Sequence, residues 1–460
     1  MRAPIVTVLG HVDHGKTTLL DVIRKTDTAS REAGGITQSV GSSKVKTESG
    51  EFSFLDTPGH SAFSAMRLEG AKVADVAVLA VAADDGAMPQ TREAIKYLRE
   101  TQTPFVVAIT KTDLPGANIE KALSSLEKEG VLLEKRGGDV PYVALSAKKK
   151  EGIEDLLAMI KLLFEVTVSQ DTDSELEAYV VEAAKKKHGP TALVAIKKGE
   201  IQVGDALHTR EAGIKVRAIF GSSGEKTSLA GAGEVVEILG FSDVPKVGSK
   251  ISRGPVLTEK IREEKRAIPA SGEETFPVVL RADTDGSLRA AMGSLPDKVH
   301  LVSADVGEVG ERDVLLAKSM GAHLLAFNLK IPVKITKLGM SEGVPINQFS
   351  VIYDLLDYVG EGVEKRKSSI KGAAQIMAEF PYDNKKIAGV SLSEGELKQG
   401  DNVTLMRGEQ ELGTAKIISM RKGKNEISFI RAGEEGGLLL TPQLDFAKGD
   451  VLISSTKAKT

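Results

Sequence analysis

One short stretch near the amino terminus combines the residue types that bind phosphate. Residues 10–17 read Gly-His-Val-Asp-His-Gly-Lys-Thr, which fits the pattern Gly-x-x-x-x-Gly-Lys-[Ser/Thr]. Gly10 and Gly15 allow the backbone to curl so that its N–H groups point at phosphate oxygens. Lys16 brings a positive charge for the β and γ phosphates, and Thr17 brings a hydroxyl for Mg²⁺. The alternative is a glycine-rich turn that binds no ligand.

The elements predicted on either side of this stretch are those that a phosphate site needs. An apolar strand is predicted over residues 5–9, and a helix is predicted from residue 16 to about residue 24. The positive dipole end of that helix would face the bound phosphates. This context favours a phosphate-binding loop over the ligand-free turn.

A second polar cluster follows the strand predicted over residues 51–55. It begins with Asp56, whose carboxylate is suited to hold Mg²⁺ through water, and it includes Gly59, whose N–H can approach a γ-phosphate closely. Thr37 can complete the metal ligands from a glycine-bearing segment that we expect to be mobile. An Asp-Thr-Pro-Gly sequence alone is also an ordinary turn.

Two further polar clusters follow buried strands predicted over residues 105–109 and 142–145. The first cluster, residues 110–113, ends in Asp113, and the second is Ser-Ala-Lys at residues 146–148. The Asp113 carboxylate can accept two hydrogen bonds from the N1–H and N2–H₂ edge of guanine, whereas adenine would leave it unpaired. Guanine is therefore the predicted base.

All four clusters lie in a region of alternating strands and helices, residues 1 to about 168. A buried strand is predicted over residues 73–82, a helix at about residues 90–100 and an amphipathic helix over residues 153–164. Each cluster follows the carboxyl end of a strand, which is where open α/β sheets bind ligands. Together the four clusters predict one nucleotide site.

The composition narrows the classes of protein that remain. The chain has 460 residues, enough for about three domains, and 41% of them are hydrophobic. It contains no cysteine, which excludes disulfides, thiolate nucleophiles and cysteine-based zinc sites. The net charge of −3 and an aromatic content of 4% provide no general attraction for nucleic acid, so any RNA must be held by local patches.

Neither a membrane anchor nor a secretion signal is expected. The longest apolar run, residues 76–83, is too short to span a bilayer, and residues 1–4 lead directly into the first predicted strand. We therefore predict a soluble, cytoplasmic protein with no membrane partner.

After residue 168 the pattern changes to short strands broken by glycines. Residues 174–254 are predicted to form a small antiparallel β-barrel. The charged residues 255–273 have mixed signs and few apolar side chains, and they are predicted to be a linker, with a solvated helix face as the alternative.

Alternation of strands and helices returns in residues 274–349, which are predicted to form a small α/β domain. Asp285 and Gly286 are predicted to form a turn, and Ser287 is predicted to cap the helix that follows. No catalytic cluster is present in this region.

A connecting helix is predicted over residues 350–370, although Gly360 and Gly362 weaken the helical pattern. Residues 371–460 are again rich in predicted strands. Gly-Glu-Ile-Gln-Val-Gly-Asp at residues 199–205 returns as Gly-Glu-Leu-Lys-Gln-Gly-Asp at residues 395–401. The repeat predicts a second barrel built like the first, and the simpler alternative is a shared turn.

With these clusters the first domain, residues 1–168, resembles the P-loop GTPases, and Gly-His-Val-Asp-His-Gly-Lys-Thr and Asp-Thr-Pro-Gly-His resemble the translational GTPases. The resemblance implies that His60 orients the attacking water, whereas a lone histidine is otherwise more often a surface or capping residue. Thr110 stands where that family usually has asparagine, so the hydrogen bond tying its loop to the phosphate loop would be made differently. Lys111 and Asp113 are kept.

The patterns and the resemblance together give the candidate residues of this site. His60 is the candidate catalytic residue, and the candidate metal ligands are Thr17, Thr37 and Asp56. The candidate nucleotide-binding residues are Gly10, His11, Val12, Asp13, His14, Gly15, Lys16, Thr17, Thr18, Asp56, Thr57, Pro58, Gly59, Thr110, Lys111, Thr112, Asp113, Ser146, Ala147 and Lys148.

The order of domains along the whole chain resembles the family of bacterial-type translation initiation factor two. The expected architecture is an α/β P-loop GTPase domain followed by a β-barrel, a small α/β domain, a connecting helix and a second β-barrel. The motifs that resemble this family in particular are residues 33–38, 282–287, 306–308, 313–314, 327–328 and 352–355.

This resemblance implies a factor that uses GTP, GDP and Mg²⁺ and acts as a monomer in translation initiation. It would bind the small (30S) ribosomal subunit, engage formylmethionyl initiator tRNA through the last barrel, promote joining of the large (50S) subunit and leave after GTP hydrolysis. Two alternatives remain open. They are an elongation-type GTPase that delivers another aminoacyl-tRNA, and a GTPase switch with a protein rather than a ribosomal partner.

The candidate tRNA-binding residues lie in two stretches of the last barrel. They are Arg421, Lys422, Lys424, Glu435 and Gly437. The basic residues would contact phosphates near the acceptor end, and the others would border the formylmethionyl pocket. A solvated basic turn is the alternative. Gly423 and Gly436 stand where the family has an aromatic residue and a cysteine, so recognition of the formyl group would be altered.

Overall fold

The structure of the chain is a computed structural model. It describes residues 2–26, 37–38, 40–134, 136–167, 175–210, 212–254, 275–368, 370–382, 385–408, 410–423 and 425–455. The contacts divide the chain into two compact units. The first unit comprises Met1–Glu264, Val278–Leu295 and Val302–Leu356, and the second comprises Lys265–Pro277, Pro296–Leu301 and Asp357–Thr460. The predicted linker, residues 255–273, lies outside the described residues.

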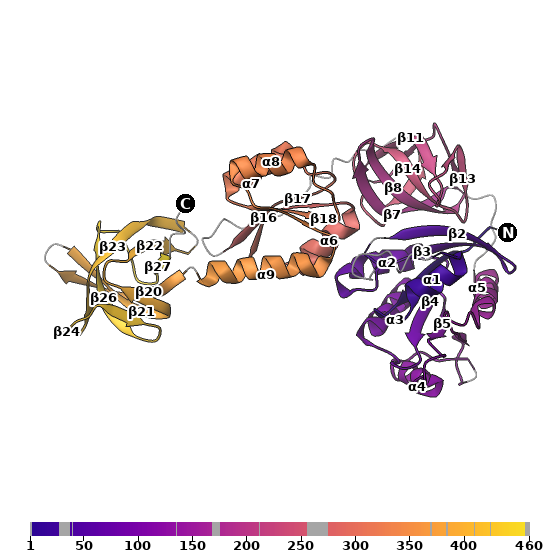
Figure 1. The fold of residues 1–460 in the computed structure, drawn as a ribbon, viewed down its shortest axis with the longest axis horizontal. Helices are drawn as coiled ribbons and strands as arrows, with labels where there is room; N and C mark the ends of the chain where they lie inside the picture. Colours follow the sequence, from indigo (N-terminus) through magenta and orange to yellow (C-terminus); the bar gives the residue numbers. More distant parts are fainter. Residues whose placement is uncertain are drawn as a thin grey trace. The chain divides into compact units, whose positions relative to one another are not determined.

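A six-stranded sheet in the order β2-β3-β1-β4-β5-β6 forms the centre of the first domain (Figure 1). All its pairings are parallel except β2 with β3, which is antiparallel. The strands are β1 (Ile5–Gly10), β2 (Gly41–Thr47), β3 (Gly50–Asp56), β4 (Val76–Ala82), β5 (Phe105–Thr110) and β6 (Tyr142–Ala144). The predicted α/β class of this domain is confirmed.

Helices cover both faces of this sheet. Apolar side chains of α1 (Lys16–Arg24) and α5 (Ile153–Thr167) share one hydrophobic core with one face of the sheet. Those of α2 (Ser64–Val73), α3 (Pro89–Thr101) and α4 (Ile119–Lys128) pack on the other face. Strands buried on both faces explain the nearly unbroken apolar runs of β1, β4 and β5.

The prediction that one strand runs over residues 73–82 is wrong at its amino end. Helix α2 continues to Val73, and β4 begins only at Val76. The boundary is set by Asp75, whose buried carboxylate accepts a hydrogen bond from the Ile5 N–H at 2.9 Å and pairs with both terminal nitrogens of Arg2. A charged side chain needs such partners when it is buried, and Arg2 and the Ile5 N–H supply them here.

Short strands form a closed barrel after the first domain. Its ring of strands runs β7-β8-β14-β11-β10-β15 and closes from β15 back to β7, around an apolar core. The strands of this region are β7 (Glu177–Lys186), β8 (Gly189–Lys198), β9 (Glu200–Gln202), β10 (Ala206–His208), β11 (Gly213–Phe220), β12 (Lys226–Thr227), β13 (Leu229–Gly231), β14 (Val235–Phe241) and β15 (Lys250–Arg253).

A four-stranded sheet in the order β17-β16-β18-β19 follows, with helices α6 to α8. Its elements are β16 (Phe276–Ala282), α6 (Asp285–Ser294), β17 (Val299–Val306), α7 (Glu311–Met320), β18 (His323–Phe327), α8 (Val333–Glu342) and β19 (Ile346–Phe349). The predictions of a turn at Asp285-Gly286 and a cap at Ser287 are wrong, because α6 already begins at Asp285. The cap is Thr284, whose hydroxyl accepts a hydrogen bond from the Ser287 N–H at 3.2 Å.

Helix α9 (Ile352–Ser368) is continuous through both of its glycines, so the weak helical pattern there was misleading. Gly362 lies against the ring of Phe276, where an added Cβ would come within 2.5 Å of the ring carbons. This glycine is thus required by a close packing contact and does not mark a break.

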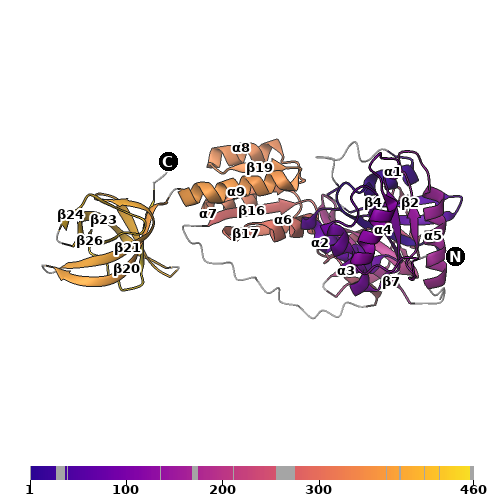
Figure 2. The same ribbon diagram turned by 90° about the horizontal axis from the view of Figure 1, so that it is seen from below.

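The second unit contains a barrel, drawn in yellow and orange in Figure 2. Its closed ring of strands runs β20-β27-β22-β23-β26-β21. Its strands are β20 (Ile370–Tyr382), β21 (Lys385–Lys398), β22 (Asn402–Arg407), β23 (Gln410–Lys422), β24 (Asn425–Glu426), β25 (Phe429–Arg431), β26 (Glu435–Thr441) and β27 (Val451–Ser455). When the six ring strands of each barrel are numbered along the chain, both rings have the same order, 1-2-5-4-3-6.

The repeated turn also has the same geometry in both barrels. The Gly204 N–H donates to the Val216 carbonyl at 2.8 Å, and the Gly400 N–H donates to the Ile417 carbonyl at 2.8 Å. Each copy ends in an aspartate whose carboxylate accepts a hydrogen bond from the backbone N–H three residues earlier. The similarity therefore extends over whole barrels and not only over a shared turn. Across the described part of the chain, no helix is long and apolar enough to cross a membrane.

Candidate functional site

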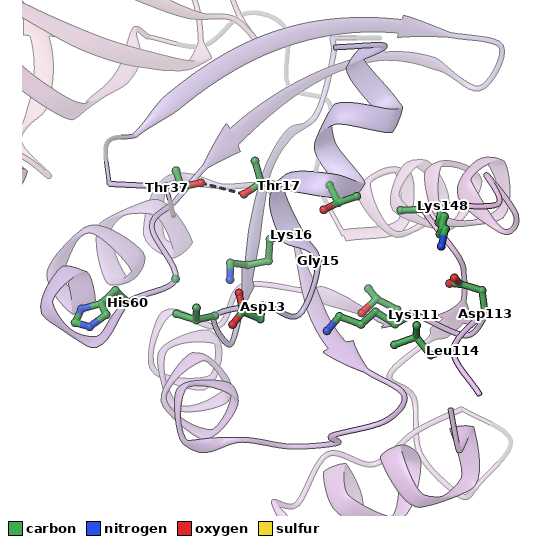
Figure 3. A pocket seen from close by; sticks show the side chains of 15 residues that line it. Asp13, Gly15, Lys16, Thr17, Thr37, His60, Lys111, Asp113, Leu114 and Lys148 are labelled. Atoms are coloured by element: carbon green, nitrogen blue, oxygen red, sulfur yellow. Dashed lines mark hydrogen bonds between the residues drawn. The ribbon is translucent and has the colours of Figure 1, made fainter. Parts of the chain in front are cut away.

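A pocket of about 530 Å³ lies at the carboxyl ends of the first domain's strands (Figure 3). It brings together residues from all four predicted clusters. Its lining comprises Val12, Asp13, Gly15, Lys16, Thr17, Thr18, Thr37, Gly59, His60, Thr110, Lys111, Asp113, Leu114, Ala147 and Lys148. The other candidates, Gly10, His11, His14, Asp56, Thr57, Pro58, Thr112 and Ser146, do not line the pocket, and several of them support residues that do.

The phosphate loop curls because two of its glycines adopt positive φ angles. Gly15 has φ 76°, immediately before α1 begins at Lys16, and Gly10 has φ 146°. A side chain at Gly10 would overlap the carbonyl oxygen of Ala80, so β4 approaches this position too closely for any other residue. The helix end and the N–H groups of the loop consequently face the pocket.

The Lys16 ammonium is held inside this loop. Its Nζ donates to the His11 carbonyl at 2.5 Å and lies so near Gly59 that a Cβ there would come within 2.5 Å of it. Burial lowers the pKa of Lys16 to about 8, although the nearby Asp56 carboxylate partly opposes that shift. An anion in the pocket would supply the charge partner that this buried ammonium needs.

Oxygen atoms suited to a hard divalent cation gather beside Lys16. The hydroxyls of Thr17 and Thr37 are 2.9 Å apart, as the dashed line in Figure 3 indicates. The buried carboxylate of Asp56 ends strand β3, with Arg24 at 3.7 Å from one of its oxygens. Two hydroxyls and a carboxylate are ligand types that Mg²⁺ accepts, so these residues fit the expected metal.

The opposite end of the pocket carries the residues predicted to recognise guanine. The Ser146 hydroxyl donates to the Asp113 carboxylate at 2.7 Å, and this hydrogen bond holds the pKa of Asp113 below its usual range. Asp113 is therefore a charged acceptor at neutral pH. The Thr110 hydroxyl donates to the His14 carbonyl at 2.8 Å, so threonine ties this loop to the phosphate loop in place of the expected asparagine.

His60 lies at the rim of the pocket. Its Nδ1 accepts a hydrogen bond from the Ala62 N–H at 3.0 Å. Its ring packs edge-to-face with the ring of Tyr353, and the two ring centroids are 4.6 Å apart. Burial, followed by the charge of Arg67, lowers the pKa of His60, so its ring is neutral at physiological pH.

Three residues that support the pocket were not predicted from the sequence. Arg67 is fully buried and donates to the carbonyls of residues 58, 59 and 60, and its other terminal nitrogen pairs with Glu93. The Gln90 side chain accepts the Val12 N–H at 2.8 Å. Leu114 lines the pocket together with Asp113. Its sequence signal is weak, because it is simply an apolar residue that directly follows Asp113.

A second pocket, of about 620 Å³, lies on the C-terminal barrel. It brings together four of the five candidate tRNA-binding residues, and the fifth, Lys424, lies outside the described residues. Its lining comprises Met377, Ala378, Phe380, Ile387, Gly389, Val390, Arg421, Lys422, Gly423, Glu435, Gly436 and Gly437. One side is thus apolar and the other carries two cations and a carboxylate.

The apolar side of this second pocket was not predicted. Met377 and Phe380 are about half exposed on β20, and a Cβ at Gly389 would lie 2.7 Å from the Phe380 ring. The glycine on β21 therefore lets the aromatic ring lie close against the barrel wall.

The fold and the first pocket together define a P-loop GTPase. Residues 1–166 match the family model described as the elongation factor Tu GTP binding domain, and residues 175–254 match elongation factor G domain 2. Residues 255–360 match the model described as translation-initiation factor 2.

Similarity to individual proteins extends over nearly the whole chain. The translation initiation factor IF-2 of Thermus thermophilus is 37% identical over 98% of this chain and 86% of its own length. That of Caldanaerobacter subterraneus subsp. tengcongensis is also 37% identical, over 99% and 70% respectively. Among solved structures, GDP-bound aIF5B from Aeropyrum pernix is 28% identical over 99% of this chain and 92% of that chain, with a TM-score of 0.46. The chain belongs to the translation initiation factor IF-2 family, as its motifs predicted.

Proposed function

We propose that this translational GTPase places formylmethionyl initiator tRNA on the 30S subunit, promotes joining of the 50S subunit, and leaves the ribosome after hydrolysing GTP. One observation carries the proposal: a single pocket gathers Lys16, Thr17, Thr37, His60 and Asp113 in a chain that belongs to the IF-2 family. We further propose that the factor acts as a monomer in the cytoplasm.

Substrate binding follows from the charges and donors of the pocket. Lys16 and the N–H groups of the phosphate loop would hold the β and γ phosphates, while Asp113 would accept the guanine edge. Thr17, Thr37 and Asp56 would hold Mg²⁺, which neutralises charge on the phosphate oxygens when it is bound. The remaining candidates in the four clusters would shape the loops around the nucleotide.

Hydrolysis requires a water molecule in line with the γ-phosphorus. The water oxygen attacks that phosphorus, the bond to the bridging oxygen breaks, and the electron pair leaves with GDP while inorganic phosphate forms. We propose that His60 orients this water once its ring turns toward the phosphates. The segments that carry Thr37 and Gly59 would be ordered by the γ-phosphate and released when it is lost.

The pocket of the C-terminal barrel supports a role in tRNA binding. Arg421 and Lys422 would contact phosphates near the acceptor end, because cations bind the backbone without reading sequence. Met377 and Phe380 provide an apolar wall that suits a thioether side chain. Glu435 and Gly437 would border the aminoacyl group, and Lys424 remains a candidate from the sequence alone.

A GTPase assay with and without purified ribosomes tests this function. Wild-type protein is expected to hydrolyse GTP slowly alone and much faster with ribosomes, and His60→Ala is expected to abolish the stimulation while GDP binding persists. Equal stimulation of both proteins would exclude the role of His60. Tight binding of elongator tRNA, or no response to ribosomes, would favour the elongation-type or the non-ribosomal alternative.

A further inference from the structure

The imidazole of His60 is packed against a tyrosine from a distant part of the chain. Tyr353 lies in the first turn of α9, and the two rings meet at 88° with centroids 4.6 Å apart. Both residues belong to the first compact unit. An edge-to-face pair at this separation is favourable because the positive edge of one ring meets the negative face of the other.

In this arrangement the imidazole does not face the phosphate site. Figure 3 shows the ring of His60 directed away from Lys16 and from the hydroxyl pair of Thr17 and Thr37. Its Nδ1 is already occupied by the Ala62 N–H. A neutral ring held on one edge by a hydrogen bond and packed against Tyr353 must give up these contacts before it can orient water at the γ-phosphate.

The same helical turn is also attached to the segment that carries Thr37. The Gln38 side chain donates to the Ser350 carbonyl at 2.8 Å and accepts the Ile352 N–H at 3.0 Å. These two hydrogen bonds cap the start of α9 and hold Tyr353 next to the pocket rim. The position of Tyr353 is therefore tied to the two segments of the pocket that are expected to respond to the γ-phosphate.

We propose that Tyr353 is a positioning residue that holds His60 in its outward orientation and keeps GTP hydrolysis slow until the first turn of α9 moves away. The inference rests on the proposed role of His60. It assigns to Tyr353 an inhibitory effect on the isolated protein that a purely structural packing residue would not have.

The test measures GTP turnover by the full chain without ribosomes. Tyr353→Ala is expected to raise kcat several-fold with an unchanged KM for GTP, because the ring is freed while the nucleotide contacts are untouched. Tyr353→Phe keeps the ring and should behave as wild type. The double variant Tyr353→Ala/His60→Ala should show no increase, and Met340→Ala, which removes an exposed side chain of α8, serves as the matched control.

A spectroscopic measurement makes the test independent of activity. In NMR spectra of histidine-labelled protein, the ring signals of His60 can be assigned by their absence in His60→Ala. These signals should carry a ring-current shift from Tyr353. The shift should be lost in Tyr353→Ala and retained in Tyr353→Phe. Unchanged or lower turnover in Tyr353→Ala, with the shift lost, would overturn the inference, as would a wild-type spectrum without that shift. If His60→Ala retains ribosome-stimulated hydrolysis, the proposed role of His60 fails instead, whatever Tyr353 does.

Discussion

At the scale of single residues, the nucleotide pocket depends on charges whose ionisation is set by their surroundings. The hydrogen bond from Ser146 keeps Asp113 charged, whereas burial makes the charge on Lys16 easier to lose. Asp113, the predicted acceptor for guanine, therefore stays charged across the physiological pH range. The Lys16 ammonium is stabilised only in part by Asp56, so the phosphates of a bound nucleotide would stabilise its charged form further.

This difference predicts that nucleotide affinity falls as pH rises above 8. Because the pKa of Lys16 is about 8 in the free protein and the phosphates require its charged form, binding at higher pH must take up a proton. Affinity should then fall by up to about tenfold per pH unit. Calorimetry of GDP binding at pH 7 and pH 8.5, in buffers with different ionisation enthalpies, measures the uptake.

The control for this experiment is Lys16→Arg, which stays charged at both pH values. Proton uptake by the wild type at pH 8.5 should exceed that of the arginine variant, which reports all other titrating groups. Equal uptake by the two proteins would show that Lys16 is already fully charged before nucleotide arrives.

At the scale of elements, β7, α2 and α6 meet at one buried carboxyl group. Glu182 on β7 accepts the Ala183 N–H at 2.9 Å and the Gly286 N–H of α6 at 3.1 Å. A side chain at Gly286 would overlap Met66 of α2, so the three elements are in tight contact. The family motif at residues 282–287 supplies Gly286 to this junction.

The junction predicts a pH-dependent stability. Burial raises the pKa of Glu182 from 4.5 to about 7, so the folded state binds this proton more tightly than the unfolded state. The contribution is fully present below pH 4.5 and is lost as pH rises through 7, at about 3 kcal/mol in total. The difference in thermal unfolding between wild type and Glu182→Gln, followed from pH 5 to 8, measures it.

Glutamine cannot ionise, so the wild type should lose stability relative to Glu182→Gln across that range. A constant difference between the two proteins would mean that this carboxyl group has the same pKa in the folded and unfolded states. GDP binding serves as the check that both proteins keep an intact first domain.

Much of this element structure follows from local pattern, and the exceptions have tertiary causes. The strands and loops of the nucleotide site were predictable because apolar runs and glycine motifs are local signals. The end of α2 depends on Asp75 pairing with Arg2, and the cap of α6 depends on which hydroxyl reaches the helix. Arg67 could not be found from sequence because its three carbonyl partners are brought together only by the folded loop.

At the scale of the whole molecule, two barrels share one strand order but differ in what they present. The C-terminal barrel carries a pocket with exposed Met377 and Phe380, and four predicted residues surround the same cavity. The repeat visible in the sequence therefore predicted the framework. It could not predict the pocket, because exposure of an apolar strand face is decided by the packing of the finished barrel.

This pocket predicts a selective loss of tRNA binding. Phe380→Ala should weaken formylmethionyl initiator tRNA binding by roughly tenfold, because truncating an aromatic anchor removes about 1–2 kcal/mol. GDP affinity should be unchanged. Filter binding of labelled tRNA measures the loss, with Leu412→Ala, an exposed residue of the same barrel outside the pocket, as the control. Equal affinities for wild type and Phe380→Ala would place tRNA elsewhere.

The most direct test of the account is nucleotide calorimetry with wild type and Asp113→Asn. The wild type should bind GDP but not ADP, and the variant should lose at least about 100-fold in GDP affinity, since removing one partner of charge-assisted hydrogen bonds costs about 3 kcal/mol. The variant should gain affinity for xanthosine diphosphate, because the asparagine amide can donate to the carbonyl that replaces the guanine amino group. Comparable binding of GDP and ADP by the wild type, or no loss in the variant, would contradict the account.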